Sequence, residues 1–480
     1  MTDREPLRGR ILELVLAGIF VAALLGVGVA YGVAVMKYKI FPNRILHEAQ
    51  LAYDAWRNLG NEDYPPIVMS WEKGPPARPI RTLDAAAGKE LILMTGGFYA
   101  RLDLCPKFGC LAWVMDRSGK VLHTWPAPDP AVLFADAKGY SGSAKPINFY
   151  VTGLALAPDG ALVTTFQRFN SFPYYVGVAK FDVGGKLLWK RFGSNHHWPE
   201  LGADGRIYVP GATLGKQSYF ANTAIPVHCK SGDLAYMEGV QVLSPDGALL
   251  HDFSAQSVIV EADLPGLLYS IKDGCDAYHV NGVDLVNAAA APGLDANVGD
   301  LLVSLREASM LAVLDQDTGH IKHLIPGRTA AQHSPKFLPD GSILVLDNLG
   351  GDRRLGGSRV IRILPGQARS EVVYPRSAAD ALTPFYTENM GMLAPSARGD
   401  RVLVSSTKQG RVFELDVATG KPLWVYEHVI DFAPFIKARG LKRTETFARV
   451  KAMGAYYVNN SAFLQAAAQT ADDLPSRQRP

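Results

Sequence analysis

A strand–turn–strand pattern recurs six times in this chain and limits its possible folds more than any other feature. Each copy joins two apolar strands through a turn built on Asp or Gly, and the second strand often ends in an aromatic residue. The copies cover residues 113–125, 178–190, 240–253, 311–325, 360–374 and 412–426. A second pattern, a turn followed by an apolar strand, occurs as "APDGALVTTF", "GADGRIYVPG", "LPDGSILVLD" and "ARGDRVLVSS". Both patterns are typical of hairpins.

Six copies separated by about 50–70 residues indicate four-stranded sheets repeated around an axis. One such sheet cannot bury both faces alone, and stacking of neighbouring sheets completes the core. We therefore predict an all-β fold, a six-bladed β-propeller over residues 81–440. The acids in "PDG" and related turns are hairpin residues rather than active-site acids. Because propellers support many unrelated activities, the function must be inferred from the site.

The N-terminus predicts a membrane anchor. Residues 14–36 contain no charged side chain. As a helix this stretch is about 35 Å long, enough to cross a hydrocarbon core of about 30 Å. A cleaved signal peptide is the alternative, but its apolar core is only about 7–15 residues long. We predict a tail and transmembrane helix over residues 1–40, inserted in the bacterial inner membrane with the large domain in the periplasm. Lys and Arg flank the span equally, so charge does not decide the orientation.

The segments on either side of the propeller are predicted as follows. Residues 41–80 contain an amphipathic helix (43–59) and a Pro-rich connector. Residues 441–480 contain a helix (444–458) followed by a disordered tail. A transmembrane helix could also bind a membrane-protein partner.

Charge and cysteine content restrict the partners and the compartment. The 480 residues carry a net charge of +3, with Lys and Arg scattered, so nothing indicates nucleic-acid binding. Cys105 and Cys110, in "CPKFGC", are close enough for a disulfide in an oxidising compartment, and Cys229 and Cys275 could form another. A zinc site is the alternative for these cysteines, but a single C-x4-C motif is weak support for one.

Histidines precede the predicted inner strands of three successive blades. These are the pair His196 and His197, then His279, then His333. Each alone could be an ordinary core histidine. Their repeated placement predicts imidazoles that converge on a pocket at the propeller axis.

Two further polar residues belong to this group. Asn281 lies two residues after His279, so both side chains point to the same face if the segment is extended. Arg306 ends the next apolar strand, after an insertion rich in Ala and Gly (287–300) that we expect to lengthen a loop near the pocket.

Three histidines could bind zinc, copper or iron, but a guanidinium among metal ligands adds repulsion. Alternatively, Arg and His could hold a sulfate- or phosphate-type anion while one imidazole attacks it. The second interpretation uses every member of the set and requires no cofactor or metal.

At these residues the chain resembles the nucleotide-donor-independent arylsulfotransferase family of exported six-bladed propellers. The resemblance rests on "HHWPELGADGRIYV", "YHVNGVDLV", "GDLLVSLREASMLAVLDQDTG", "QHSPKFLPDGSILVLDN" and "GRVFELDVATGKPLWVYEH". It covers roughly residues 95–430 in order. Family members are commonly soluble periplasmic proteins with a separate N-terminal β-domain, whereas this chain has an apolar N-terminal helix.

The resemblance implies ping-pong transfer of a sulfuryl group from an aryl sulfate donor to a phenolic acceptor. His333 matches the family's nucleophile, which is transiently sulfated. His279, Asn281 and Arg306 match groups that hold the sulfuryl oxygens. One of His196 and His197 matches a further pocket histidine, and alternation along a strand predicts that only one of them faces the axis.

Two other functions stay open at this point. A catalytically silent, membrane-tethered propeller could act as a scaffold or as a subunit of a membrane complex. A metal- or quinone-dependent oxidoreductase is the third possibility, but the chain has neither vicinal cysteines nor a carboxylate-rich calcium motif.

Overall fold

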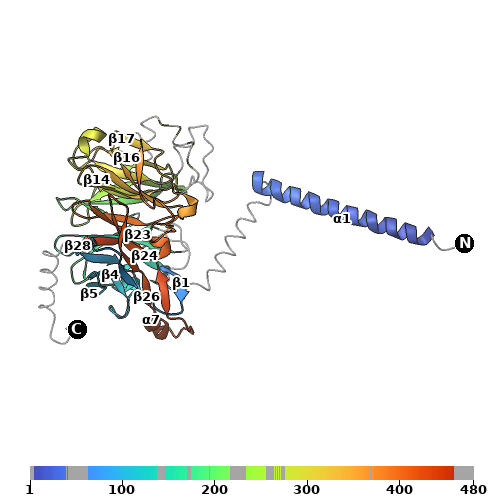
Figure 1. Cartoon of the computed structure of the whole chain (residues 1–480), viewed down its shortest axis with the longest axis horizontal. Helices are drawn as coiled ribbons and strands as arrows, with labels where there is room; N and C mark the ends of the chain where they lie inside the picture. The colour runs from blue at the N-terminus through green and yellow to red at the C-terminus, as the bar shows by residue number, and fades with distance from the viewer. Residues whose placement is uncertain are drawn as a thin grey trace. The chain divides into compact units, whose positions relative to one another are not determined.

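The computed structural model divides the chain into two compact units, Met1–Asp63 and Tyr64–Pro480. It describes residues 5–38, 41, 63–137, 146–169, 175–193, 195–216, 234–255, 264, 266, 269, 271, 276–367 and 369–458. The first unit contains one described helix, α1 (Glu5–Tyr38) (Figure 1). Its segment Leu12–Val35 is long and apolar enough to cross a membrane, although a signal sequence has the same properties. The helix predicted at 43–59 lies outside the described residues.

The second unit is built from antiparallel sheets of four or more strands, here called blades 1 to 6 in chain order. Blade 1 consists of β3 (Leu91–Thr95), β4 (Cys110–Met115), β5 (Val121–Pro126) and the C-terminal β28 (Ala455–Val458). Blade 2 consists of β6 (Phe149–Leu156), β7 (Leu162–Arg168), β8 (Tyr175–Phe181) and β9 (Leu187–Phe192). Blade 3 consists of β10 (Glu200–Leu201), β11 (Ile207–Lys216), β12 (Leu234–Leu243) and β13 (Leu249–Ser254).

The remaining blades follow the same plan. Blade 4 consists of β14 (Val280–Leu285), β15 (Leu301–Leu305), β16 (Met310–Leu314) and β17 (Ile321–Pro326). Blade 5 consists of β18 (His333–Phe337), β19 (Ile343–Asp347), β20 (Arg359–Ile363) and β21 (Ser370–Tyr374). Blade 6 consists of β22 (Met392–Pro395), β23 (Arg401–Ser406), β24 (Arg411–Asp416) and β25 (Pro422–Glu427), with β2 (Ile80–Thr82) at its outer edge. The predicted six-bladed propeller is therefore confirmed.

A few short elements complete this unit. They are the three-stranded sheet of β1 (Val68–Glu72), β27 (Phe447–Val450) and β26 (Val429–Asp431), the helices α3 (Pro130–Leu133) and α7 (Ala433–Ala438), and the 3-10 turns Pro146–Asn148, Ala291–Leu294, Arg353–Leu355 and Thr407–Gln409. The strand β1 lies within the segment predicted to be a Pro-rich connector.

Local turn chemistry explains why each repeat folds into a hairpin. In the β8–β9 turn, the side chain of Asp182 accepts hydrogen bonds from the backbone N–H groups of Gly184 and Lys186. In the β18–β19 turn, Asp340 does the same for Ser342, and Gly341 adopts a φ of +84° that suits glycine. These acids satisfy backbone donors, as expected for hairpin residues.

The predicted C-terminal helix at 444–458 is wrong, because this segment forms the strands β27 and β28. Strand β28 pairs with β3, with Ala455 opposite Met94, and supplies the inner strand of blade 1. Blade 1 has only three strands of its own, so the open edge of β3 supplies backbone partners that local sequence does not reveal. The β structure accordingly extends beyond 81–440, and the tail after Val458 lies outside the described residues.

The inner strands all run in the same direction along the axis. In space, β14 lies beside β18, β18 beside β22, and β22 beside β28. Their first residues therefore gather at one end of the propeller and their last residues at the other. The predicted histidines precede or begin inner strands, so this topology brings them to the same end.

Candidate active site

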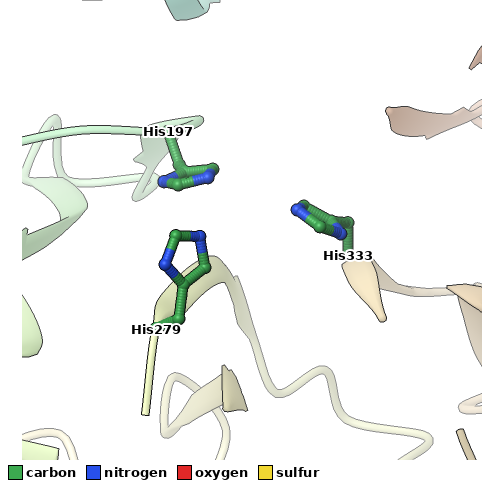
Figure 2. Close-up of side chains that lie close together, drawn as sticks. All are labelled: His197, His279 and His333. Atoms are coloured by element: carbon green, nitrogen blue, oxygen red, sulfur yellow. The ribbon is translucent and has the colours of Figure 1, made fainter. Parts of the chain in front are cut away.

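A cavity of about 370 Å³ lies at the end of the axis where the inner strands begin. Its lining residues are Tyr150, Gln167, His197, Asp276, His279, Arg306, Glu307, His333, Asn389 and Met390. Four of the six residues predicted from the sequence are in this set, contributed by the starts of blades 3, 4 and 5 and by the end of β15. Figure 2 shows the imidazole rings of His197, His279 and His333 converging on a common space.

His333 is held in one orientation by polar groups on both ring nitrogens. Its Nδ1 lies 2.8 Å from Oδ1 of Asn348. The Asn348 amide nitrogen donates to the carbonyls of Thr387 and Met390, so its oxygen must act as the acceptor. Nδ1 of His333 therefore carries the hydrogen. The lone pair of Nε2 accepts a hydrogen bond from the Met390 N–H at 3.2 Å, which a ligand must displace before it can bind Nε2.

The electrostatic environment keeps His333 neutral. The side chain is buried, and burial together with the positive charge of Arg306 and the proximity of His279 holds its pKa well below 6.5. An imidazole in this state has an unprotonated Nε2 at neutral pH. His197 is likewise buried, and burial with the neighbouring His196 and His279 lowers its pKa strongly.

The other two cavity histidines also use Nδ1 for contacts within the protein. Nδ1 of His279 lies 2.6 Å from Oδ2 of Asp276, and Nδ1 of His197 lies 2.5 Å from Nδ1 of His196. Each ring can therefore offer Nε2 to a ligand. His197 and His279 also have left-handed backbone angles, with φ of +56° and +47°. Such conformations are costly for residues other than glycine and are typical of functional sites.

Arg306 supplies the positive charge of the cavity. Its Nη1 pairs with the carboxylate of the adjacent Glu307, and its backbone N–H donates to the carbonyl of His279 at 3.2 Å. About one-fifth of each side chain of this ion pair is exposed, so the guanidinium is accessible to a ligand. An anion could exchange with Glu307 for the guanidinium donors.

The structure does not bring Asn281 and His196 to the cavity wall. Asn281 is fully buried, and its amide nitrogen donates to the carbonyl of Gln332 at 2.9 Å. The expectation that it shares a face with His279 fails because the positive φ of His279 and a bulge between Val280 and Val283 interrupt the extended alternation. Asn281 instead supports the residue that precedes His333.

His196 stacks on the ring of Tyr175, with centroids 3.7 Å apart, behind His197. His197 is therefore the member of the pair that lines the cavity, in line with the expectation that only one of them would.

The insertion at 287–300 lies at the opposite end of the axis, where Asn287 lines a different cavity. The expectation that this insertion lengthens a loop near the pocket is therefore wrong. The reason is that the insertion follows the last residue of β14, whereas the cavity with the histidines lies where β14 begins.

Several cavity residues could not be identified from the sequence. Tyr150 and Gln167 are hydrogen bonded to each other across β6 and β7, and Asn389 and Met390 precede β22. They belong to blades 2 and 6, in which no histidine precedes the inner strand. Asp276 could have been noticed in the sequence, because it lies three residues before His279.

The three histidines could also hold a metal ion. One ring nitrogen from each of His197, His279 and His333 lies within 4.8 Å of the other two. Three imidazoles are a common zinc ligand set, but Arg306 lines the same cavity, and its charge opposes a cation.

The predicted disulfide is present in the structure. A disulfide joins Cys105, in the loop before β4, to Cys110, the first residue of β4. Cys229 and Cys275 lie outside the described residues.

Comparisons with solved structures show distant propeller-like neighbours. A protein of unknown function from Bacteroides caccae is 11% identical, with 78% of this chain and 100% of that chain covered and a TM-score of 0.44. A streptogramin B lyase is 11% identical, with 80% and 88% covered and a TM-score of 0.36. The Swd1 β-propeller domain of Myceliophteria thermophila is 12% identical, with 73% and 89% covered and a TM-score of 0.35. At these TM-scores the likenesses identify no activity.

The family comparison is more specific. No curated protein sequence matches the chain. The profile of the family described as arylsulfotransferase (ASST) matches residues 158–428, from the β6–β7 turn to the end of blade 6. The matched region contains His197, His279, Arg306 and His333 and is more than half of the chain. The chain therefore belongs to the arylsulfotransferase (ASST) family.

Proposed function

We propose that this protein is a membrane-anchored arylsulfotransferase that moves a sulfuryl group from an aryl sulfate to a phenol through a sulfohistidine. Membership of the ASST family supports an arylsulfotransferase-like function. The observation that carries the mechanism is the state of His333. Its Nδ1–H is held by Asn348, and its unprotonated Nε2 lies in the same cavity as Arg306, where it accepts a backbone hydrogen bond from Met390 that the donor would replace.

In the first half-reaction, Nε2 of His333 attacks the sulfur of the donor. The N–S bond forms as the S–O bond to the aryl oxygen breaks, and the departing oxygen takes a proton from the cavity. The nucleophile retains its Nδ1 hydrogen, so the N-sulfo ring is cationic and balances the charge of its sulfuryl group. The second half-reaction reverses these steps with the acceptor phenol.

Arg306 and Nε2 of His197 are the groups that would hold the sulfuryl oxygens, and Nε2 of His279 would face the transferring group beside them. Fixed donors aimed at the group that gains negative charge lower the barrier without reorganisation. We assign the three histidines to this anion rather than to a metal ion, because Arg306 then attracts the ligand instead of repelling it.

The direct test uses full-length protein in detergent with 4-nitrophenyl sulfate and an acceptor phenol. We expect release of nitrophenolate, formation of the acceptor sulfate, and parallel lines in double-reciprocal plots, as a ping-pong scheme requires. Intersecting lines would contradict the covalent intermediate. Inactivity towards a broad panel of aryl sulfates would instead favour a catalytically silent scaffold or a subunit of a membrane complex.

The location is part of the proposal. Helix α1 would anchor the chain in the bacterial inner membrane, with the propeller in the periplasm. The Cys105–Cys110 disulfide supports an oxidising compartment. We expect externally added protease to digest the propeller in spheroplasts while the protein stays with the membrane fraction. Protection in intact spheroplasts would reverse the orientation, and release into the periplasm would indicate a cleaved signal sequence.

A further inference from the structure

Two carboxyl groups lie close to His279: Glu238, which is fully buried, and Asp276, which is half-buried and lines the cavity. Glu238 comes from β12 of blade 3, and Asp276 lies just before β14 of blade 4. One ligand-type atom from each of Glu238, Asp276 and His279 lies within 4.8 Å of the other two. The cluster therefore joins two blades at the wall of the cavity.

Glu238 is fully buried without a Lys or Arg partner among its contacts in the described chain. Oε1 accepts a hydrogen bond from the Tyr175 hydroxyl at 2.8 Å, and Oε2 accepts one from the Val280 N–H at 2.5 Å. The nearest histidine nitrogen, Nε2 of His196, is 3.7 Å away. Burial, with the charge of Asp276 and a hydrogen bond to it, raises the pKa of Glu238 well above 4.5. The surroundings of Glu238 therefore favour its acid form, in which it can donate to Asp276.

Asp276 then carries the negative charge of the pair. Its Oδ2 accepts the Nδ1–H of His279 at 2.6 Å. The other two cavity histidines have neutral partners at Nδ1, because His333 contacts the amide of Asn348 and His197 contacts His196. Within the described chain, His279 is thus the cavity histidine with an anionic partner at Nδ1. An anion there stabilises a doubly protonated ring, which a nucleophile cannot be.

We propose that Asp276, held in place by the acid form of Glu238, positions His279 as the proton donor to the departing phenolate and the proton acceptor from the incoming phenol. This inference rests on the proposed sulfuryl transfer. His333 is the nucleophile because its partner is neutral, and His279 is the acid–base group because its partner is charged.

The proton balance closes over one cycle. His279 begins with hydrogens on both nitrogens and gives its Nε2 hydrogen to the aryl oxygen as the S–O bond breaks. The ring is then neutral, with Nδ1–H still donating to Asp276. The acceptor phenol returns a proton to Nε2 as its oxygen attacks the sulfur on His333. Glu238 keeps its proton throughout.

Several charged or titratable groups surround His279. Asp276 contacts its Nδ1. His196, His197 and His333 interact with it electrostatically from blades 3 and 5. Arg306 and Glu307 line the same cavity as an ion pair, so their charges largely offset each other.

The test compares two donors that differ in leaving-group acidity, 4-nitrophenyl sulfate and phenyl sulfate. An acid catalyst matters most for the poorer leaving group, phenolate. We expect Asp276→Asn to reduce kcat/KM for phenyl sulfate by about 10²-fold or more, and for 4-nitrophenyl sulfate by much less. Glu238→Gln, which can still donate to Asp276, should give a smaller loss with the same preference. Equal losses on both donors would overturn the proposal, because they indicate a structural role.

Glu414→Gln is the matched control. Glu414 is equally buried, lies in the third strand of blade 6, and contacts Arg117, Arg401 and Tyr457 away from the cavity. We expect the two donors to be used at the wild-type ratio. A changed ratio in this variant would remove the link between Asp276 and the leaving group.

A second measurement does not depend on activity. In protein labelled with 15N-histidine, proton NMR should show a low-field resonance for Nδ1–H of His279 bound to a carboxylate. We expect it in wild-type protein and in Glu414→Gln, but not in Asp276→Asn. Its absence from wild type would overturn the proposed pairing. Its presence in a protein inactive on every aryl sulfate would instead leave the pairing in place and refute the sulfuryl transfer.

Discussion

The two ends of the propeller axis have cavities with opposite character. The larger, about 690 Å³, lies where the inner strands end and is lined by residues of every blade, including Lys336, Glu200 and Asp284. There Lys336 pairs with Glu200 and lies 3.4 Å from Asp284, so the buried charges satisfy one another. The smaller, about 370 Å³, is lined by three histidines whose Nδ1 atoms contact the protein and whose rings lie close together. We therefore base the proposed active site on the chemistry of the smaller cavity rather than on cavity size.

A single strand, β18, connects these two environments. It begins at His333 in the smaller cavity and reaches Lys336 and Phe337 in the larger one. Variants at its two ends therefore separate catalysis from stability.

The largest expected effect is at the histidine end. His333→Ala removes the nucleophile, so we expect the transfer rate to fall by at least about 10³-fold with little change in thermal stability. Lys336→Met should do the reverse, because it leaves the half-buried carboxylates of Glu200 and Asp284 without their cation and costs about 1–3 kcal/mol of unfolding free energy. Steady-state kinetics and thermal melts on both variants provide the measurement. Normal stability with lost activity in Lys336→Met would move the active site to the larger cavity.

A smaller loss is expected at Arg306. Arg306→Met removes the charge-assisted hydrogen bonds to the sulfuryl oxygens, and we expect kcat/KM to fall by about 10–100-fold. Arg306→Lys keeps the charge without the planar fork and should recover only part of this loss. The matched control is Arg362→Met on the outer part of blade 5, where Arg362 contacts Asp340 and Ser342. Wild-type kinetics in Arg306→Met would show that the guanidinium does not touch the donor.

The titratable groups at the two ends of the axis should change the folding stability in opposite directions as the pH falls. Buried His197 and His333 have pKa values well below 6.5, so the unfolded chain binds more protons than the folded chain as the pH falls below 6.5. Each then removes up to about 1.4 kcal/mol of stability per pH unit. Burial raises the pKa of Asp284 to about 6, and this carboxyl contributes stability at low pH that is lost as the pH rises through 6.

The histidine effect should dominate because four buried histidines, His196, His197, His333 and His428, oppose two carboxyls with raised pKa values, Asp284 and Glu238. We expect the melting temperature to fall between pH 7 and pH 5, and to fall more steeply in Asp284→Asn. A melting temperature that rises on acidification would show that the histidines are not buried in neutral form.

The smallest expected effect is that of metal removal. If Arg306 and the histidines hold an anion, dialysis against EDTA should leave the transfer rate unchanged. Loss of activity that zinc restores would assign the three histidines to a metal ion and would contradict their assignment to an anion.

Local chemistry explains which features could be predicted from the sequence. The hairpins depend on Asp and Gly in tight turns, so the six repeats and the register of His197, His279 and His333 were readable. Strand β28 could not be predicted, because its partner β3 is about 360 residues away in the chain. The two strands become neighbours only when the blades close into a ring. Asn281 was misplaced because the left-handed backbone at His279 breaks the alternation. Glu238 gave no signal at all, since it reaches the site from the third strand of another blade.

The most direct test of the central claim is the mass of the protein after brief incubation with 4-nitrophenyl sulfate and no acceptor. We predict an increase of one SO3 group, mapped to the peptide that contains His333, that disappears when a phenol is added. The adduct should not form in His333→Ala. An active enzyme that carries no adduct, or carries it on another residue, would contradict the account.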